Sequence, residues 1–243
     1  CENIESFRGD TGKALSMISD DGFFFEVKEN YGPEMVTAFI RLNGMTVGCV
    51  ANRTEVLDEE NEKTAEYEPV LGARGCDKAA EFVSFCDAFN IPVLALVNVK
   101  GYKQSKCTER RIAKAAGRLT YAFANADVPK VTVVIGEAYG SAYVTMNSKS
   151  IGADIVYAWP DAKIGMMDAA AAVKIMYAEE ISASDKAAAL ISEKAAEYEA
   201  LQSSAAAAAG RGYVDDIIKA DETRQRVIAA FEMLFTKRER SEE

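Results

Sequence analysis

Three consecutive small residues, Gly140, Ser141 and Ala142, follow an apolar β-branched run and begin a segment whose composition suits a helix. Small residues at such a turn allow a helix to pack closely against a sheet. They also allow a ligand to approach the helix, whose first backbone N–H groups have no partner inside the helix and attract anions. Residues 140–142 are therefore either a close-packing contact or an anion-binding turn.

The chain contains no histidine among its 243 residues. This absence excludes a Ser-His-Asp triad, a Cys-His pair and a histidine-ligated zinc site for the chain acting alone. Ser141 is a poor candidate nucleophile, because no lysine base stands at Ser-x-x-Lys spacing either. Any chemistry must come from carboxylates, Lys, Tyr, Cys, backbone amides or a cofactor.

The five cysteines are an odd number without CxxC spacing. This pattern predicts free buried thiols and no metal site or disulfide framework. They are Cys1, Cys49, Cys76, Cys86 and Cys107. A cysteine in place of a start methionine suggests a processed or truncated chain.

The overall composition is that of a globular protein with a sizeable core, since 49% of the residues are hydrophobic. The formal net charge of −10 makes nucleic acid an unexpected partner. No apolar run approaches the ~20 residues of a membrane span, and no signal-peptide pattern opens the chain. We expect a soluble, cytoplasmic protein.

The regions that must position residues 140–142 alternate between helix and strand patterns. Residues 77–90 place apolar side chains at helical spacing, and residues 91–99 form a continuous apolar run typical of a strand buried on both faces. A helix over 108–126 and a strand over 130–136 repeat the alternation. This order predicts an α/β fold with a parallel sheet covered by helices.

Further elements are predicted on both sides of this alternation. Asn43-Gly44 predicts a tight hairpin between two strands, and the acidic segment 55–69 predicts a solvated loop or a short exposed helix. The other expected strands cover 23–27, 35–42, 45–51, 153–160, 162–167 and part of 211–218. The expected helices cover 1–22, 168–209 and 221–240, the last of which could serve either the core or an oligomer interface.

Four stretches of this sequence together resemble the crotonase superfamily, and more narrowly the carboxyltransferase subunit of biotin-dependent acyl-CoA carboxylases and decarboxylases. They are RLNGMTVGCVANR (41–53), residues 77–102, residues 130–167 with AYGSAY, SKSIGAD and YAWP, and RGYVDDII (211–218). The resemblance implies a single crotonase-like domain over 1–243, a ClpP/crotonase superhelix of ββα units with C-terminal helices. It also implies a leading helix at 1–22 and oligomer contacts by the helical region 168–243.

Family carboxyltransferases have two crotonase-like halves, and this chain resembles the second. The resemblance implies that this half receives carboxybiotin, while the first half mainly binds the acyl-CoA, a coenzyme A thioester of the propionyl or methylmalonyl type. The implied partners are a biotin carboxyl carrier protein, the N-terminal half and further copies of the chain, as in the hexamers of the family.

Motif positions carry the family's site onto particular residues. The resemblance implies that Gly140, Ser141 and Ala142 are catalytic, with the amides of Ser141 and Ala142 oriented toward biotin. The cofactor itself could then act as the base, while the protein holds negative charge on two oxygens through backbone donors.

The same comparison implies cofactor contacts from four residues. Gly101 and Tyr102 match a loop that usually reads Pro-Gly-Phe, and Val144 matches a position that shapes acyl-chain preference. Tyr143 lies beside them in the motif, although an aromatic residue in such a segment is more often part of the core.

This chain departs from the family pattern at several positions. Lys100 replaces the usual Pro, Ser141 replaces a common Gly, and KQSKCTERR (103–111) is shorter and more basic than the glycine-rich stretch of the family. The cations of this stretch could meet coenzyme A phosphates or a carboxylate, or could form a solvated cluster. They are Lys100, Lys103, Lys106, Arg110 and Arg111.

Two alternative functions stay open. A crotonase-type acyl-CoA hydratase or isomerase needs a pair of positioned carboxylates, and Glu137 is the only carboxylate close to the motif. A non-catalytic assembly subunit would keep the fold and contribute an interface. Addition of the missing half separates this last alternative from a carboxyltransferase.

Overall fold

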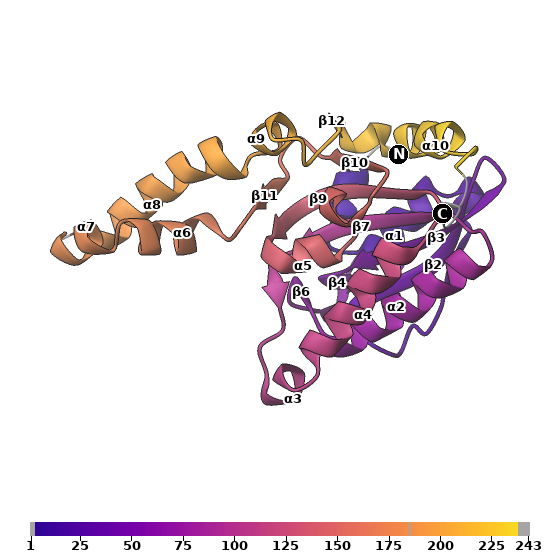
Figure 1. Ribbon diagram of the computed structural model, residues 1–243, viewed down its shortest axis with the longest axis horizontal. Helices are drawn as coiled ribbons and strands as arrows, with labels where there is room; N and C mark the ends of the chain where they lie inside the picture. Colours follow the sequence, from indigo (N-terminus) through magenta and orange to yellow (C-terminus); the bar gives the residue numbers. More distant parts are fainter. Residues whose placement is uncertain (1–2, 185, 238–243) are drawn as a thin grey trace, which may run out of the picture.

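A mostly parallel sheet forms the centre of the computed structural model, which describes residues 3–184 and 186–237 (Figure 1). Its strands lie in the order β1-β2-β3-β7-β9-β10-β12, and β11 pairs with the end of β9. The bounds are β1 (Phe24–Glu26), β2 (Met35–Leu42), β3 (Met45–Asn52), β7 (Val93–Val99), β9 (Lys130–Tyr139), β10 (Ile155–Ala158), β11 (Lys163–Gly165) and β12 (Asp216–Ile217).

The predicted hairpin between β2 and β3 is confirmed. Leu42 pairs with Met45, and both turn residues have positive φ angles, 50° at Asn43 and 77° at Gly44. The Asp20 carboxylate accepts hydrogen bonds from the amides of Asn43 and Gly44 at 3.2 and 2.7 Å. Asn-Gly therefore forms the tight turn because both residues tolerate the left-handed conformation.

Helices cover both faces of the sheet, as the alternation of patterns predicts. One face carries α2 (Ala73–Ala88) and α4 (Ile112–Asn125), and the other carries α1 (Thr11–Ile18) and α10 (Thr223–Met233). The helix expected over 108–126 is divided, because α3 (Lys106–Glu109) ends before α4 begins. The last helix belongs to the core, since α10 buries an apolar face that includes Phe231.

The prediction of a loop or short helix at 55–69 is wrong. The segment forms a two-stranded antiparallel sheet of β4 (Glu55–Leu57) and β5 (Lys63–Glu66). The Asp10 carboxylate accepts the amide of Leu57 at 2.9 Å, and Lys63 lies 3.0 Å from Glu55. Polar composition correctly indicated exposure, but the pairing depends on contacts with the leading helix region that composition does not encode.

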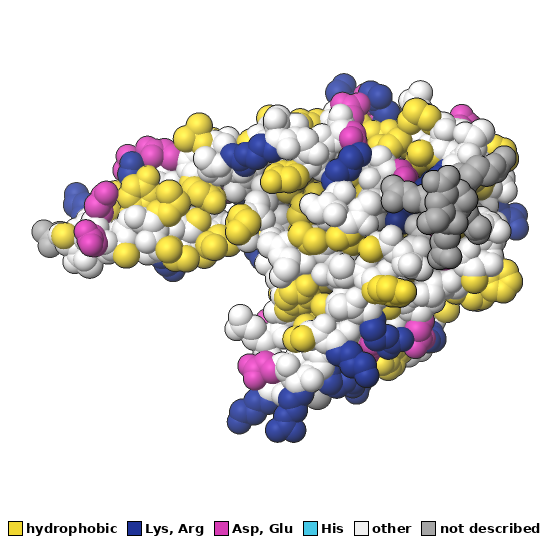
Figure 2. All heavy atoms as spheres, in the orientation of Figure 1, with side chains coloured by type: hydrophobic (Ala, Val, Ile, Leu, Met, Phe, Trp, Pro, Cys, Tyr) yellow, Lys and Arg dark blue, Asp and Glu magenta, His cyan; other side chains and the backbone are white. Residues whose placement is uncertain are grey.

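The predicted helices of 168–209 form an arm that extends away from the sheet (Figure 1). Large apolar side chains stay exposed on it, including Ile175 and Met176, and Figure 2 shows apolar side chains gathered along this arm. Its elements are α6 (Ala169–Met176), α7 (Ala178–Ala183), α8 (Ala187–Tyr198), the π-helical turn η4 (Glu199–Ser203) and α9 (Ala205–Gly210). Oligomer contacts by this region stay a prediction.

Short elements complete the described chain. The leading region is not one continuous helix, because 3-10 turns lie on both sides of α1. The short elements are η1 (Ile4–Phe7), η2 (Asp20–Gly22), η3 (Lys149–Ile151), η5 (Ala220–Glu222), β6 (Val70–Leu71), β8 (Gly101–Tyr102) and α5 (Gly140–Thr145).

The cysteines for which side-chain burial is described are buried thiols, as predicted. Burial raises the pKa of Cys76 and of Cys86 to about 12, so both stay protonated near neutral pH. Cys49 is buried as well, while Cys1 and the side chain of Cys107 lie outside the described residues. Across 3–184 and 186–237 there is no group of His, Cys, Asp and Glu side chains that could hold a metal, and no helix is long and apolar enough to cross a membrane.

Candidate functional site

The buried strand β9 turns directly into the short helix α5 at Gly140. The φ angle of Gly140 is +59°, and a Cβ atom at this position would lie 3.0 Å from the carbonyl oxygen of Met166. Both facts favour glycine, because a side chain in the left-handed region is strained and this one would also be crowded. The small residue is needed for the turn itself.

The amides of Ser141 and Ala142 lie in the first turn of α5. Such amides have no acceptor inside the helix, and Tyr139 at the N-cap offers no side-chain cap. Ser141 is exposed, whereas Ala142 is buried against the core. The turn therefore presents backbone donors beside an open surface position.

The loop after β7 lies beside this helix. The Tyr102 hydroxyl lies 2.9 Å from Thr145 Oγ1, and Thr120 of α4 donates to the same Thr145 oxygen at 3.2 Å. Gly101 precedes Tyr102 in β8, which pairs with β6, and a Cβ atom at Gly101 would meet nothing within 4 Å. The structure thus places the loop of Gly101 and Tyr102 beside α5, while contact of these residues with a cofactor stays a prediction.

Asn52, Asn98 and Gly136, which the sequence analysis missed, hold the ends of β7 and β9 in place. Asn98 Oδ1 accepts a hydrogen bond from the backbone amide of Glu137 at 3.0 Å, and the backbone amide of Asn98 donates to Asn52 Oδ1 at 3.0 Å. A Cβ atom at Gly136 would lie 2.5 Å from Asn98 Oδ1. An asparagine inside the apolar run 91–99 was the only available signal, because the contact joins strands distant in sequence.

Glu137 pairs with a cation at this edge of the sheet. Its Oε2 atom lies 3.0 Å from Lys100 Nζ, with the Lys100 side chain 48% and the Glu137 side chain 26% exposed. Both residues come at the carboxyl ends of neighbouring parallel strands. The acid-base work of a hydratase requires a second positioned carboxylate, and this ion pair does not supply one.

Tyr143 and Val144 differ from the loop residues in their surroundings. Tyr143 packs into the apolar core with 7% of its surface exposed, and no partner for its hydroxyl occurs in the described part of the chain. Burial, followed by the nearby Tyr213 and Asp215, raises the pKa of Tyr143 to about 12. Val144 is half-buried. Ligand contact by either residue stays a prediction, and the core position of Tyr143 favours the packing role.

The residues that surround the turn fit a ligand whose oxygen carries negative charge. The first-turn amides of α5 have no side-chain cap and are of the kind that attracts anions, and a Cβ atom at Gly101 would meet nothing within 4 Å. Hydroxyl contacts through Thr145 hold the two backbone segments in fixed relation. Contact of a cofactor with Gly140, Ser141 and Ala142 stays a prediction.

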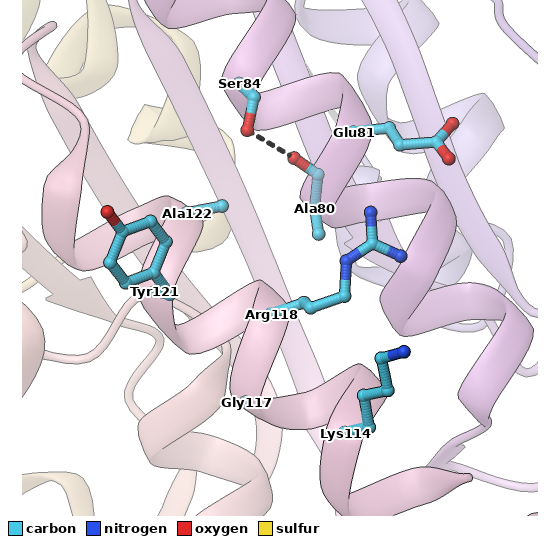
Figure 3. Close-up of a pocket in the computed structure, with 8 residues that line it drawn as sticks. All are labelled: Ala80, Glu81, Ser84, Lys114, Gly117, Arg118, Tyr121 and Ala122. Atoms are coloured by element: carbon cyan, nitrogen blue, oxygen red, sulfur yellow. Dashed lines mark hydrogen bonds between the residues drawn. The ribbon is translucent and has the colours of Figure 1, made fainter.

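A separate groove lies on the other side of α4, against α2 (Figure 3). Lys114 and Arg118 extend from α4 toward α2, where Glu81 is placed. Arg118 also lies 2.8 Å from Asp77. The groove thus has side chains of both charges.

The fold is that of an α/β protein in which a strand of a mostly parallel sheet ends at a left-handed glycine and a short helix. The chain belongs to the carboxyl transferase domain family, whose model matches residues 7–243. It is 41% identical over 231 residues to the methylmalonyl-CoA carboxyltransferase 12S subunit of Propionibacterium freudenreichii subsp. shermanii, covering 95% of this chain and 42% of that subunit. It is 39% identical over 227 residues to the methylmalonyl-CoA decarboxylase subunit alpha of Propionigenium modestum, covering 93% and 42%.

Solved structures agree with this assignment. The transcarboxylase 12S structure with methylmalonyl-coenzyme A and methylmalonic acid bound has a TM-score of 0.85 at 40% identity, covering 94% of this chain and 42% of that one. The beta subunit of P. aeruginosa geranyl-CoA carboxylase shares the fold at 22% identity, with a TM-score of 0.74, covering 90% of this chain and 41% of that one. The predicted crotonase-like α/β fold is confirmed. The chain spans about 42% of the length of the curated relatives named above.

Proposed function

We propose that the chain supplies the carboxybiotin side of an acyl-CoA carboxyltransferase site, with a propionyl- or methylmalonyl-type thioester as acyl substrate. The observation that carries this proposal is the uncapped α5 turn, held beside the Gly101–Tyr102 loop by the contact between Tyr102 and Thr145. The relatives named for methylmalonyl-CoA chemistry support the substrate class. The rest of the site belongs to the part of the relatives that this chain does not span.

The residues of this chain bind and orient the carboxybiotin without changing their own protonation state. When bound, carboxybiotin supplies the carboxyl group and a base for the α-proton of the thioester. The Ser141 and Ala142 amides stabilise negative charge on the ureido oxygen, and Gly140 sets the direction in which they point. Donors fixed before the reaction need no reorganisation, so a chain without histidine can still lower the barrier substantially.

The partners follow from the same proposal. A biotin carboxyl carrier protein must bring the cofactor to α5, and an N-terminal carboxyltransferase half must present the coenzyme A thioester. The structure of the transcarboxylase 12S relative is described as a hexamer assembly, which supports a homo-oligomer here. We infer a cytoplasmic enzyme.

A carboxyl-transfer assay tests the function. Methylmalonyl-CoA decarboxylation is followed with free biotin as acceptor, for the chain alone and for the chain combined with an N-terminal half. We expect turnover only in the combined sample. Hydration of an enoyl-CoA without carboxyl transfer would establish the hydratase alternative. The absence of both activities would favour a non-catalytic assembly subunit.

A further inference from the structure

Positive charge is concentrated in one stretch of this acidic chain. Residues 100–118 contain seven of the 28 Lys and Arg residues and a single acidic residue, Glu109, although the whole chain has a net charge of −10. We call the exposed side chains of this stretch the cation-rich surface. It consists of Lys100, Lys103, Lys106, Arg110, Arg111, Lys114 and Arg118.

Three of these cations form ion pairs with two nearby carboxylates. Lys100 pairs with Glu137 at 3.0 Å, while Arg111 and Arg118 lie 3.3 and 2.8 Å from Asp77. The other four have no ion pair with any described residue, and all four are exposed. They are Lys103, Lys106, Arg110 and Lys114. Figure 2 shows basic side chains projecting from the end of the molecule where Figure 1 places α3.

The cation-rich surface adjoins the candidate site. Lys103 follows Tyr102 directly, and its amide donates to the Leu71 carbonyl at 3.0 Å. The Ser105 side chain then caps α3 by accepting the amide of Thr108 at 3.1 Å. Since Tyr102 contacts Thr145, the last residue of α5, a partner on this surface would stand next to that helix.

The distribution of the cations suits a broad acidic partner. A single phosphate is bound by donors that converge on one point, whereas these side chains extend over a loop, the short helix α3 and the first half of α4. The nearby groove between α2 and α4 is also lined by Glu81, which disfavours a phosphate there. Broad complementary potentials are typical of protein docking surfaces, where they increase the association rate.

We propose that the cation-rich surface docks an acidic surface of the protein that carries biotin, next to the α5 amides. This inference rests on the proposed function and deepens it by assigning the carrier's docking surface. Free biotin lacks a protein surface, so the docking contribution disappears when free biotin replaces the carrier. The two acceptors therefore separate docking from the chemistry of the site.

Charge reversal in this chain, assayed together with an N-terminal carboxyltransferase half, tests the proposal. We expect Lys106→Glu with Arg110→Glu to raise the KM for the biotinylated carrier about 10-fold at low salt, an effect that high salt reduces. The rate with free biotin and the KM for the acyl-CoA should not change. The matched control is Lys219→Glu with Arg41→Glu, two exposed cations outside this surface, which should leave the KM for the carrier unchanged.

Equilibrium binding of the biotinylated carrier gives a readout independent of turnover. Weaker binding by the charge-reversed protein but not by the control supports the proposal even if the acyl substrate has been assigned wrongly. Unchanged carrier binding overturns it. A raised KM for acyl-CoA, absent when an acyl-pantetheine without phosphates is used, would assign the surface to coenzyme A instead. Loss of association with the N-terminal half would assign it to the subunit interface, while absence of turnover in the unmodified protein would refute only the proposed function.

Discussion

The Tyr102 hydroxyl and Thr145 Oγ1 lie 2.9 Å apart and join the loop after β7 to the helix that follows β9. The two residues are distant in sequence, yet their contact joins the loop that contains Gly101 to the C-terminal end of α5. Thr120 donates to the same Thr145 oxygen at 3.2 Å, so α4 supports the contact from behind. The candidate site therefore depends on hydroxyl groups that position its segments and take no part in the proposed reaction.

Tyr102→Phe removes this contact while keeping the ring. We expect the free energy of unfolding to fall by roughly 0.5–1.5 kcal/mol, as for the loss of one hydrogen bond, and the carboxyl-transfer rate of the combined protein to fall as well. Tyr121→Phe is the matched control, because Tyr121 is 70% exposed on α4. Urea unfolding and the transfer assay measure the two effects. Equal stability and rate in both variants would show that the contact has no positioning role.

Ala142→Pro removes one amide donor in the first turn of α5. If that amide stabilises the ureido oxygen, the transfer rate should fall by about 10²–10³-fold. Ser141→Ala keeps its amide and removes only a hydroxyl, so it should have little effect on the rate. Circular dichroism confirms that both variants fold. A large loss with Ser141→Ala and none with Ala142→Pro would move the chemistry from the backbone to the serine side chain.

Gly140→Ala should destabilise the protein by roughly 1–2 kcal/mol, because alanine is strained at a φ of +59° and its Cβ would crowd the Met166 carbonyl. The opposite sign is expected at Gly117 in the interior of α4, where a Cβ meets nothing within 4 Å. Gly117→Ala should stabilise by roughly 0.5–1 kcal/mol, since alanine favours the helix. Urea unfolding of both variants compares the signs. A neutral Gly140→Ala would contradict the left-handed turn.

Lys78 gives the protein a pH dependence of stability that can be isolated. Its side chain is fully buried, donates to the Met35 carbonyl at 2.7 Å and lies 3.7 Å from Glu26, while desolvation lowers its pKa from 10.5 to about 8. Below pH 8 the folded state must keep a buried charge, and above pH 8 it binds fewer protons than the unfolded state. The contribution of Lys78 to stability therefore rises from pH 8 to about pH 10.5.

Urea unfolding of the unmodified protein and of Lys78→Met at several pH values measures this contribution. Their difference in unfolding free energy should change by on the order of 1–3 kcal/mol across pH 8–10.5, in favour of the unmodified protein at high pH. Taking the difference removes the opposing titration of the buried cysteines, which both proteins share. Lys28→Met, at an exposed site paired with Glu81, is the control and should show no such slope. A constant difference for Lys78→Met would mean that Lys78 titrates normally in the folded protein.

Local patterns in the sequence were sufficient to predict the alternation of helices and strands, the Asn43-Gly44 turn and the need for a small residue at the end of β9. Each depends on interactions within a few residues: apolar periodicity, turn conformation and the missing Cβ. The family resemblance added the expectation that residues 101–102 and 140–142 share a site. The absence of histidine already limited the chemistry to carboxylates, Lys, Tyr, Cys, backbone amides or a cofactor.

Tertiary structure decided what depends on contacts between distant segments. The Asn98 contact with β9, the Lys100–Glu137 pair and the Tyr102–Thr145 bond each join separate elements, and no periodicity encodes them. The β4–β5 pair was missed for the same reason, because β4 is held by Asp10, which is distant in sequence. A residue type and its spacing determine which elements form, but which side chains meet is set only when the sheet order brings their strands together.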